Sequence, residues 1–412
     1  MQYALWRSTR VFATALVIVL AGAVVALGMG GLAHASSGRA RSAAARPNIT
    51  VQTWGTVNGQ TVHLYTLTNA HRMKVRISDY GGVVQSIYAA DRRGRVRNVA
   101  LGFPNLSGYV NDFQNQPWPA AGGSGDTYFG AIIGRYANRI ANHQFTLNGV
   151  TYNLPGNNGT NNINTLHGGP NAFNTKVWAG ATFRGTGAVG LQLTYTDPDG
   201  YNGFPGAVTT VVTYTLTNSN ALRIHYRATT SKPTVVNFTN HTYFNLAGEG
   251  SGDVYGQLLR INASRYTPIN ANLIPTGALV PVARTPFDFR RLKPIGRDIR
   301  RGVQQLLIAH GYDHNWVLNG SGLRLAAFAE DPASGRTLTT STDQPGVQLY
   351  SSNFLVGDLV GPSGRTYRQT DGFTLETQHF PNSPNQPNFP STVLNPGQVF
   401  NSTTIYKLGV AR

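Results

Sequence analysis

Short runs of alternating apolar and polar residues, rich in Val, Ile, Thr and aromatic side chains, follow one another along most of this chain. Gly, Asn and Pro interrupt these runs at short intervals. A period of two residues buries one face of a strand, whereas a helix repeats its apolar residues about every 3.6 positions. The pattern therefore predicts an all-β fold, a large antiparallel β-sandwich with few short helices.

The strands expected from this pattern cover residues 61–67, 74–78, 83–88, 130–133, 144–147, 191–196, 207–216, 221–229, 234–239, 257–261, 323–329, 336–342, 347–350, 373–377 and 405–408. The clearest helical signal spans residues 299–309. Residues 111–125 are expected to form a surface insertion, in which Trp118 is more readily a packed loop aromatic than a site residue. No long period repeats, which argues against a propeller or solenoid.

The N-terminal segment has the order of a secretory signal peptide. Arg7 and Arg10 precede an apolar run over residues 11–32, and Ala33-His34-Ala35 supplies a small-residue cleavage site. Residues 1–35 are therefore expected to direct export to the periplasm or beyond the cell. The alternative is a membrane anchor that is retained, because the apolar run approaches the length that spans a bilayer. Residues 36–49 are expected to form a flexible basic linker, and residues 50–412 a single catalytic domain.

The chain is basic and contains no cysteine. Without cysteine it forms no disulfide, so stability has to come from the core. The formal charge is +17, and removal of residues 1–35, which hold two arginines and no acid, leaves +15. This charge could attract a polyanion, but the basic residues are scattered, with the densest groups at 92–97 and 290–301. We interpret both groups as solvated surface and expect no nucleic-acid partner.

Sequence signatures of several reaction types are missing. The ten histidines form no HxH or HExxH set, so no metal site is predicted. The chain also lacks a GxxxxGK[ST] loop, a GxGxxG after a strand and a GxSxG nucleophile elbow. We expect neither a nucleotide nor another cofactor.

Glu376 is one of three glutamates in the chain and falls inside an expected strand, GFTLETQ. Strand parity places Thr374, Glu376 and Gln378 on the face opposite Phe373 and Leu375. Glu376 is therefore expected to line a polar concavity. In the segment VVNFTNHTYFNL the same parity places His241 on a polar face.

Five further polar residues lie in strands or at strand ends: Asn138, Arg139, His167, Asp313 and Gln348. Each alone has an ordinary explanation, such as a surface ion pair, a turn histidine or a satisfied core group.

The order and residue content of seven segments give a further indication of function. They are FGAIIGRYANRI, TLHGG, NHTYFNL, LIPTGALVPVARTPFDF, GYDHN, QLYSSNF and GFTLETQHFPNSPNQPNFP. Together, over residues 61–408, they resemble the aldose 1-epimerase (galactose mutarotase) family. The resemblance implies a mutarotase-like β-sandwich that interconverts the α and β anomers of a free monosaccharide such as galactose or glucose.

The resemblance also implies residue roles. Glu376 is matched to the general base that acts on the C1 hydroxyl, and His241 to the general acid that acts on the ring oxygen O5. At reference pKa values near 4.3 and 6.5, the glutamate would be ionised and the histidine partly protonated at neutral pH. The sugar hydroxyls and ring oxygen would be held by Asn138, Arg139, His167, Asp313 and Gln348.

Three other functions are compatible with such a scaffold. A sugar-binding protein without activity needs no matched acid and base, so retention of Glu376 and His241 favours an enzyme. A glycoside hydrolase needs two carboxylates flanking the bond, and only Asp313 offers a second. A phosphosugar epimerase could use the many arginines. The segment before His167 is lengthened, as NNGTNNINTLHGG, and could shift that histidine.

Overall fold

The computed structural model describes residues 46–115 and 124–411. The predicted signal peptide, most of the predicted linker and Trp118 lie outside these residues. Strand β1 (Asn48–Val57) overlaps the last two residues of the expected linker. The described residues form one compact unit.

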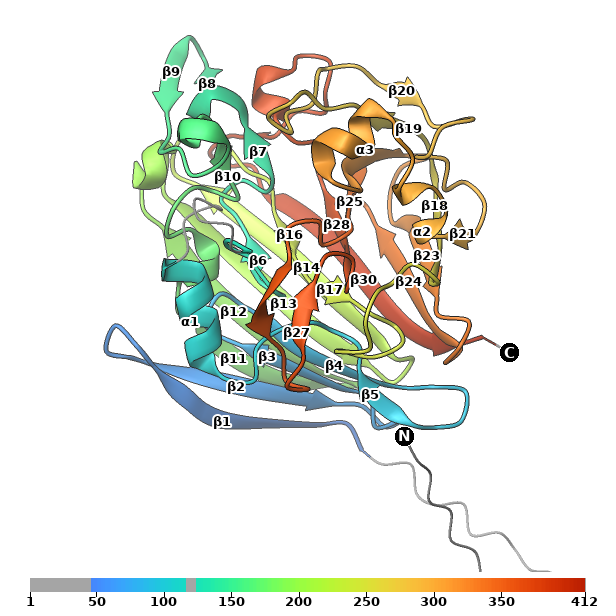
Figure 1. The fold of residues 1–412 in the computed structure, drawn as a ribbon. Helices are drawn as coiled ribbons and strands as arrows, with labels where there is room; N and C mark the ends of the chain where they lie inside the picture. The colour runs from blue at the N-terminus through green and yellow to red at the C-terminus, as the bar shows by residue number, and fades with distance from the viewer. Residues whose placement is uncertain (1–45, 116–123, 412) are drawn as a thin grey trace, which may run out of the picture. The chain divides into compact units, whose positions relative to one another are not determined.

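Three antiparallel sheets make up most of this unit, so the predicted all-β class is confirmed. Figure 1 shows the blue strands β1 and β2 at one edge of the unit and helix α3 at the opposite end. The five-stranded sheet runs β1, β2 (Gln60–Thr68), β3 (Lys74–Ser78), β4 (Val84–Ala90), β5 (Val96–Asn98). The nine-stranded sheet runs β11 (Ala179–Gly185), β12 (Ala188–Asp197), β13 (Val208–Thr217), β14 (Ala221–Thr230), β30 (Phe400–Val410), β24 (Arg336–Thr342), β23 (Arg324–Glu330), β18 (Leu258–Ile261), β21 (Lys293–Pro294).

The six-stranded sheet carries three of the polar residues singled out above, Asp313, Gln348 and Glu376. Its order is β17 (Tyr243–Phe244), β28 (Phe373–Gln378), β25 (Gly346–Tyr350), β22 (Asp313–Leu318), β19 (Ala263–Thr267), β20 (Val280–Pro281). Five short pairs complete the strands: β6 (Ile132–Ile133) with β16 (Thr239–Asn240), β7 (Arg139–Ile140) with β10 (Thr165–Leu166), β8 (Gln144–Leu147) with β9 (Val150–Asn153), β15 (Thr234–Val235) with β29 (Val393–Leu394), and β26 (Val356–Val360) with β27 (Thr366–Arg368).

Helices are short, as expected. The α-helices are α1 (Leu106–Asn115), α2 (Gly296–Ile299) and α3 (Gln304–Ala309). The 3-10 turns are Ala141–His143, Thr160–Asn162, Phe173–Thr175, Tyr201–Gly203 and Ser383–Asn385. Within the described ranges, no helix has the length and apolar character needed to cross a bilayer.

The apolar core is shared by all three large sheets. One cluster of fully buried side chains includes Val75 from the five-stranded sheet, Tyr214 from the nine-stranded sheet and Leu375 from the six-stranded sheet. The Tyr406 hydroxyl donates a hydrogen bond to the Leu375 carbonyl, which joins β30 to β28. The core therefore fixes the inner face of β28 and leaves its other face for the polar residues.

Several local predictions differ from the structure. The expected insertion at 111–125 begins inside helix α1, whose buried Leu106, Tyr109 and Phe113 stand three and four residues apart. That helical spacing starts before residue 111, so a boundary placed there hides it. The expected strand 234–239 divides into β15 and β16, and the expected helix 299–309 divides into α2 and α3. Strands β1, β11, β19 and β22 are among those that were not predicted.

Arg336 joins parts of the chain that are far apart in sequence. Its buried guanidinium donates hydrogen bonds to the carbonyls of Ala89, Arg95, Leu246 and Ala247. These acceptors belong to the β4–β5 hairpin and to the segment after β17. Because the planar guanidinium presents five donors in a fixed fork, one side chain can satisfy all four carbonyls.

We expect Arg336→Met to lower the free energy of unfolding by at least about 3 kcal/mol, because each buried acceptor left without a donor costs about 1–3 kcal/mol. Arg336→Lys should recover only part of the loss, since an ammonium lacks the fork. Urea denaturation followed by tryptophan fluorescence measures the change. Arg227→Met, at an exposed position on β14, is the control and should be near neutral. Equal stability of Arg336→Met and the wild type would contradict this role for Arg336.

Candidate active site

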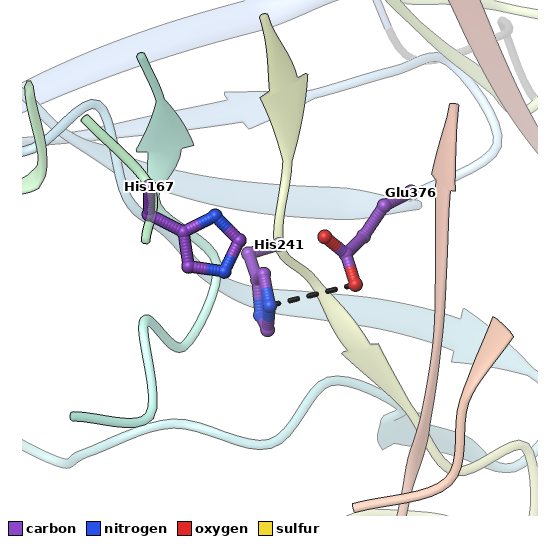
Figure 2. A group of neighbouring side chains, drawn as sticks. All are labelled: His167, His241 and Glu376. Carbon is purple, nitrogen blue, oxygen red and sulfur yellow. Dashed lines mark ion pairs between the residues drawn. The ribbon is translucent and has the colours of Figure 1, made fainter. Parts of the chain in front are cut away.

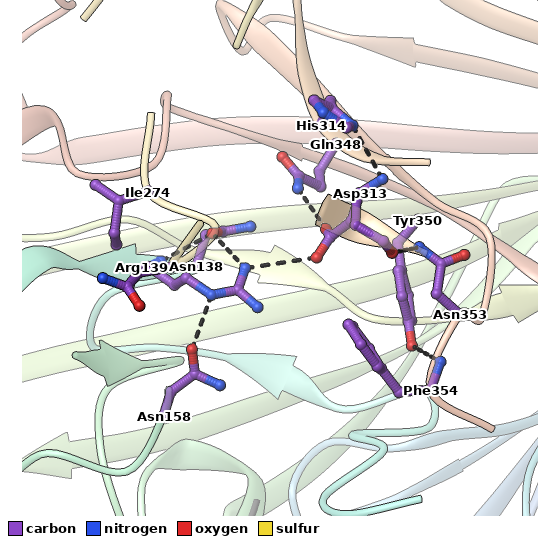
Figure 3. Close-up of polar contacts among 12 residues, drawn as sticks. Asn138, Arg139, Asn158, Ile274, Asp313, His314, Gln348, Tyr350, Asn353 and Phe354 are labelled. Carbon is purple, nitrogen blue, oxygen red and sulfur yellow. Dashed lines mark hydrogen bonds and ion pairs between the residues drawn. The ribbon is translucent and has the colours of Figure 1, made fainter. Parts of the chain in front are cut away.

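A polar pocket of about 470 Å³ lies where the six-stranded sheet meets the short pairs β6–β16 and β7–β10. Six of the seven residues predicted for the site line it: Asn138, Arg139, His167, His241, Asp313 and Glu376. The seventh, Gln348, is not among the lining residues. Its amide nitrogen donates a 2.6 Å hydrogen bond to Asp313 Oδ1 from behind (Figure 3).

Sheet register places three of these residues together. Asn315 on β22 stands opposite Gln348 on β25, and Gln348 stands opposite Glu376 on β28. Directly paired residues share a face, and Asp313 lies two residues from Asn315, so all of them project to one side. The expected polar face of β28 is thereby confirmed, since Leu375 lies in the core while Glu376 lines the pocket.

His241 enters the pocket from the turn between β16 and β17. Its Nε2 lies 3.5 Å from Glu376 Oε1, and both side chains are buried (Figure 2). The Thr374 hydroxyl donates a 2.9 Å hydrogen bond to the same carboxylate oxygen. Glu376 Oε2 and His241 Nδ1 are buried with no hydrogen-bond partner among the described residues. One carboxylate oxygen is therefore anchored and the other is free to react.

His167 is fixed by two hydrogen bonds to Asn138. The ring Nδ1 of His167 accepts a hydrogen bond from the Asn138 backbone N–H at 3.1 Å. The backbone N–H of His167 donates a second hydrogen bond to the Asn138 backbone carbonyl. Both residues have left-handed backbone angles, with φ of 63° at Asn138 and 54° at His167. An Nδ1 that accepts carries no proton, so the neutral ring holds its proton on Nε2. His167 is a hydrogen-bond donor at that atom.

Three side chains in the pocket lie close enough together to hold a metal ion, because the potential ligand atoms of His167, His241 and Glu376 are all within 4.8 Å of one another. Their hydrogen bonding does not fit a metal. A ligating imidazole normally donates its outer N–H to an acceptor, whereas the outer nitrogen of His167 accepts from Asn138. The absence of a metal from the reaction stays a prediction, and the tautomer of His167 supports it.

Arg139 is held from two sides, as Figure 3 shows. Its Nε donates to Asn158 Oδ1 at 2.9 Å, and its Nη1 lies 3.6 Å from Asp313 Oδ2. Asn158 belongs to the lengthened segment before His167. Its neighbour Asn157 clamps Leu166 through both the backbone N–H and the carbonyl of that residue. The additional residues therefore support the strand pair that carries Arg139 and His167.

Burial shifts the proton affinities of the central pair in opposite directions. Burial raises the pKa of Glu376 to about 8, which the Thr374 hydrogen bond only partly offsets, and the charge of Asp313 raises it further. Burial lowers the pKa of His241 to about 3, and it also holds the pKa of His167 well below its usual value. The expectation of an ionised glutamate beside a partly protonated histidine at neutral pH is therefore wrong. Desolvation favours the neutral form of each.

Sequence reasoning missed part of the pocket lining. Tyr128, Tyr243, Tyr350 and Phe354 also line it, and the Tyr128 ring lies 4.6 Å from that of His167. The last three fall inside segments NHTYFNL and QLYSSNF, but an aromatic in a strand is usually core, so they gave no separate signal. Asp126 lines the pocket too, with its Oδ1 buried and without a hydrogen-bond partner among the described residues.

The pocket places a buried carboxyl group beside an imidazole and surrounds them with groups that can bind hydroxyls and with aromatic rings. This combination is suited to an enzyme that acts on carbohydrates by acid–base catalysis.

Comparison with known proteins agrees with this class. The Aldose 1-epimerase family profile matches residues 63–407. The galactose mutarotase of Rattus norvegicus is 42% identical over 341 residues, 82% of this chain and 92% of that protein. The aldose 1-epimerase of Escherichia coli (strain K12) is 37% identical over 356 residues, 85% of this chain and 96% of that protein. The crystal structure of galactose 1-epimerase from Lactobacillus acidophilus NCFM aligns with a TM-score of 0.76 at 26% identity, covering 89% of this chain and all of that one.

The chain therefore belongs to the aldose 1-epimerase family, and it is an enzyme of the isomerase class.

Proposed function

We propose that this aldose 1-epimerase interconverts the anomers of free aldohexoses such as galactose and glucose, with Glu376 as general base and His241 as general acid. Glu376 removes the proton of the C1 hydroxyl while His241 protonates the ring oxygen O5. The C1–O5 bond breaks, the open-chain aldehyde rotates about C1–C2, and the ring closes on the other face with both protons returned. Atoms and charge balance without a cofactor.

The distance between the two groups carries this proposal. The two protons move on oxygens attached to the same carbon, C1, so base and acid have to be near neighbours. The 3.5 Å separation of Glu376 Oε1 and His241 Nε2 meets that requirement. Glu376 Oε2, which accepts no hydrogen bond from a described residue, is the oxygen available to the hydroxyl proton.

The surrounding groups support roles in holding the sugar. Arg139 and the Nε2–H of His167 donate hydrogen bonds, while Asp313 accepts them. Asn138 acts mainly through His167, which it orients. Gln348 supports the sugar through Asp313 rather than by direct contact, because it fixes one carboxylate oxygen and leaves the other toward Arg139.

The charges in the pocket argue against a phosphosugar. Arg139 is the one guanidinium among the residues that line it, and Asp313 already lies 3.6 Å from its Nη1. A phosphate dianion would therefore find no unpaired cation among these described residues. Neutral hexoses need none.

We expect Glu376→Gln to lower the enzymatic rate of anomer equilibration by about 10²–10⁴-fold, because the amide cannot accept the hydroxyl proton. Polarimetry of freshly dissolved α-D-glucose and α-D-galactose, with the buffer rate subtracted, measures it. His241→Gln should give a similar loss. The double variant should be little worse than either alone, because the two residues act as one unit.

Glu330→Gln is the matched control, since Glu330 lies on β23 outside the pocket and should leave the rate unchanged. Full activity of Glu376→Gln would rule out its role as base. Wild-type protein that binds hexoses without accelerating their equilibration would instead point to a binding protein.

The shifted pKa values predict an unusual pH profile. With a pKa of about 8 at Glu376 and about 3 at His241, the pair holds one proton between these values, mostly on Glu376. The reactive form, Glu376 carboxylate with His241 imidazolium, is a minor tautomer of the same charge. Activity should therefore stay level across the acid and neutral range. It should fall as the pH rises through about 8, because the pair then loses its proton.

Initial rates between pH 4 and 10, each corrected for the buffer reaction, test this profile. A decline centred near the ordinary histidine pKa of about 6.5 would show that His241 titrates like an exposed imidazole.

We also propose that residues 1–35 direct export and are removed afterwards. The proposal rests on the two arginines, the apolar run and the Ala-His-Ala site. Intact-mass measurement on protein from the producing cell should give a chain that begins at Ser36. Recovery of the full-length chain in the membrane fraction would favour a retained anchor.

A further inference from the structure

A second, larger concavity of about 1360 Å³ opens around β21 and α2, and none of its lining residues lines the sugar pocket. Six cationic side chains and two aspartates line it, for a formal charge of +4. We call it the arginine groove. Its cations are Arg284, Arg290, Arg291, Lys293, Arg297 and Arg301.

The two aspartates of the groove are already paired. Asp288 receives a bidentate pair of hydrogen bonds from Arg290, at 2.9 and 2.8 Å. Asp298 receives a 2.7 Å hydrogen bond from Lys293, and the Arg301 guanidinium lies 4.0 Å from it.

Arg284, Arg291 and Arg297 remain. All three are exposed, and none makes an ion pair or side-chain hydrogen bond with another described residue. Three guanidinium groups without an anionic partner repel one another in one concavity, and a bound anion would relieve this repulsion.

The backbone beneath these side chains is firmly held. The same stretch of sequence holds four side chains that are buried in the core: Phe287, Phe289, Ile295 and Ile299. Lys293 is also buried, with its ammonium over the Phe289 ring and donating to the Pro286 carbonyl. A rigid frame of this kind presents the guanidiniums with little ordering cost on binding.

We propose that the arginine groove binds an acidic polysaccharide, whose carboxylates pair with Arg284, Arg291 and Arg297. Guanidinium groups match carboxylates in bidentate geometry. The two aspartates of the groove suit a polymer in which hydroxyl groups lie between the charged groups. The carboxylate oxygens of these aspartates still have lone pairs that can accept hydrogen bonds from those hydroxyls. The same aspartates would repel a continuous phosphate backbone. No aromatic side chain lines the groove, so it lacks a surface on which nucleic-acid bases would stack.

Binding of polygalacturonate, measured by calorimetry at low and at physiological salt, tests the proposal. The variant Arg284→Gln/Arg291→Gln/Arg297→Gln should bind about 10-fold more weakly than the wild type. The control Arg93→Gln/Arg223→Gln/Arg227→Gln removes the same charge from exposed arginines outside the groove and should bind like the wild type. Neutral dextran should not bind to any of the three proteins.

The rate of hexose equilibration should be the same in the groove variant as in the wild type, which shows that the fold and the sugar pocket are intact. The single charge reversal Arg291→Glu gives the same test with one exposed change. Equal weakening in the groove and control variants would assign any binding to overall charge and overturn the proposal. So would no binding of polygalacturonate by the wild type, or tighter binding of duplex DNA or polyphosphate, which would make the groove a site for phosphate polymers.

Discussion

Glu376 and His241 are two ionisable side chains buried side by side, and this constraint organises the site around them. Burying a charge without a partner is costly, so each group is driven toward its neutral form. The nearby residues reduce that cost without abolishing the reactivity. Thr374 donates to one oxygen of Glu376, and the charges of Arg139 and Asp313 largely cancel close by. What remains is a pair that shares one proton, with two states of equal net charge.

Equal net charge matters for the chemistry. In the proposed reaction, a proton that moves from Glu376 to His241 creates an ion pair inside the protein, and a sugar that accepts hydrogen bonds from one side and donates to the other would stabilise this ion pair. The enzyme needs no charge from solvent for either direction of the reaction. Equilibration between two anomers has to run both ways, and a pair that returns to its starting state after each turn suits it.

Much of the fold could be predicted from the sequence, because local alternation determined it. Residues 74–78, 144–147 and 336–342 coincide with β3, β8 and β24. The abundance of asparagine also has a local cause, since ten asparagines among the described residues have positive φ, which asparagine adopts more readily than most side chains. Strand β11 is exposed along its length and has no alternation to detect. The helix α1 was hidden by a boundary set within it.

The site residues followed from the resemblance of seven segments, and the direction of Glu376 followed from parity. Their environment could not follow, because it depends on chain segments far apart. The pKa of Glu376 is raised mainly by burial within the folded chain. The place of Gln348 behind Asp313 depends on a side-chain contact, and the support of Arg139 by Asn158 depends on the folding of a lengthened loop. The arginines at 290–301 were interpreted as solvated surface. Which of them are paired is visible only once the aspartates are placed.

The register of β22, β25 and β28 has a consequence for folding. A strand shifted by one residue turns every side chain to its other face. A slip of β25 would remove Gln348 from Asp313, and a slip of β28 would exchange Glu376 for Leu375 or Thr377. A misaligned molecule would thus lack the proposed base altogether instead of working slowly. The rate of hexose anomerisation therefore depends on correct strand alignment in this protein. The specific activity of a refolded sample measures the fraction of molecules whose β22, β25 and β28 have paired in the native register.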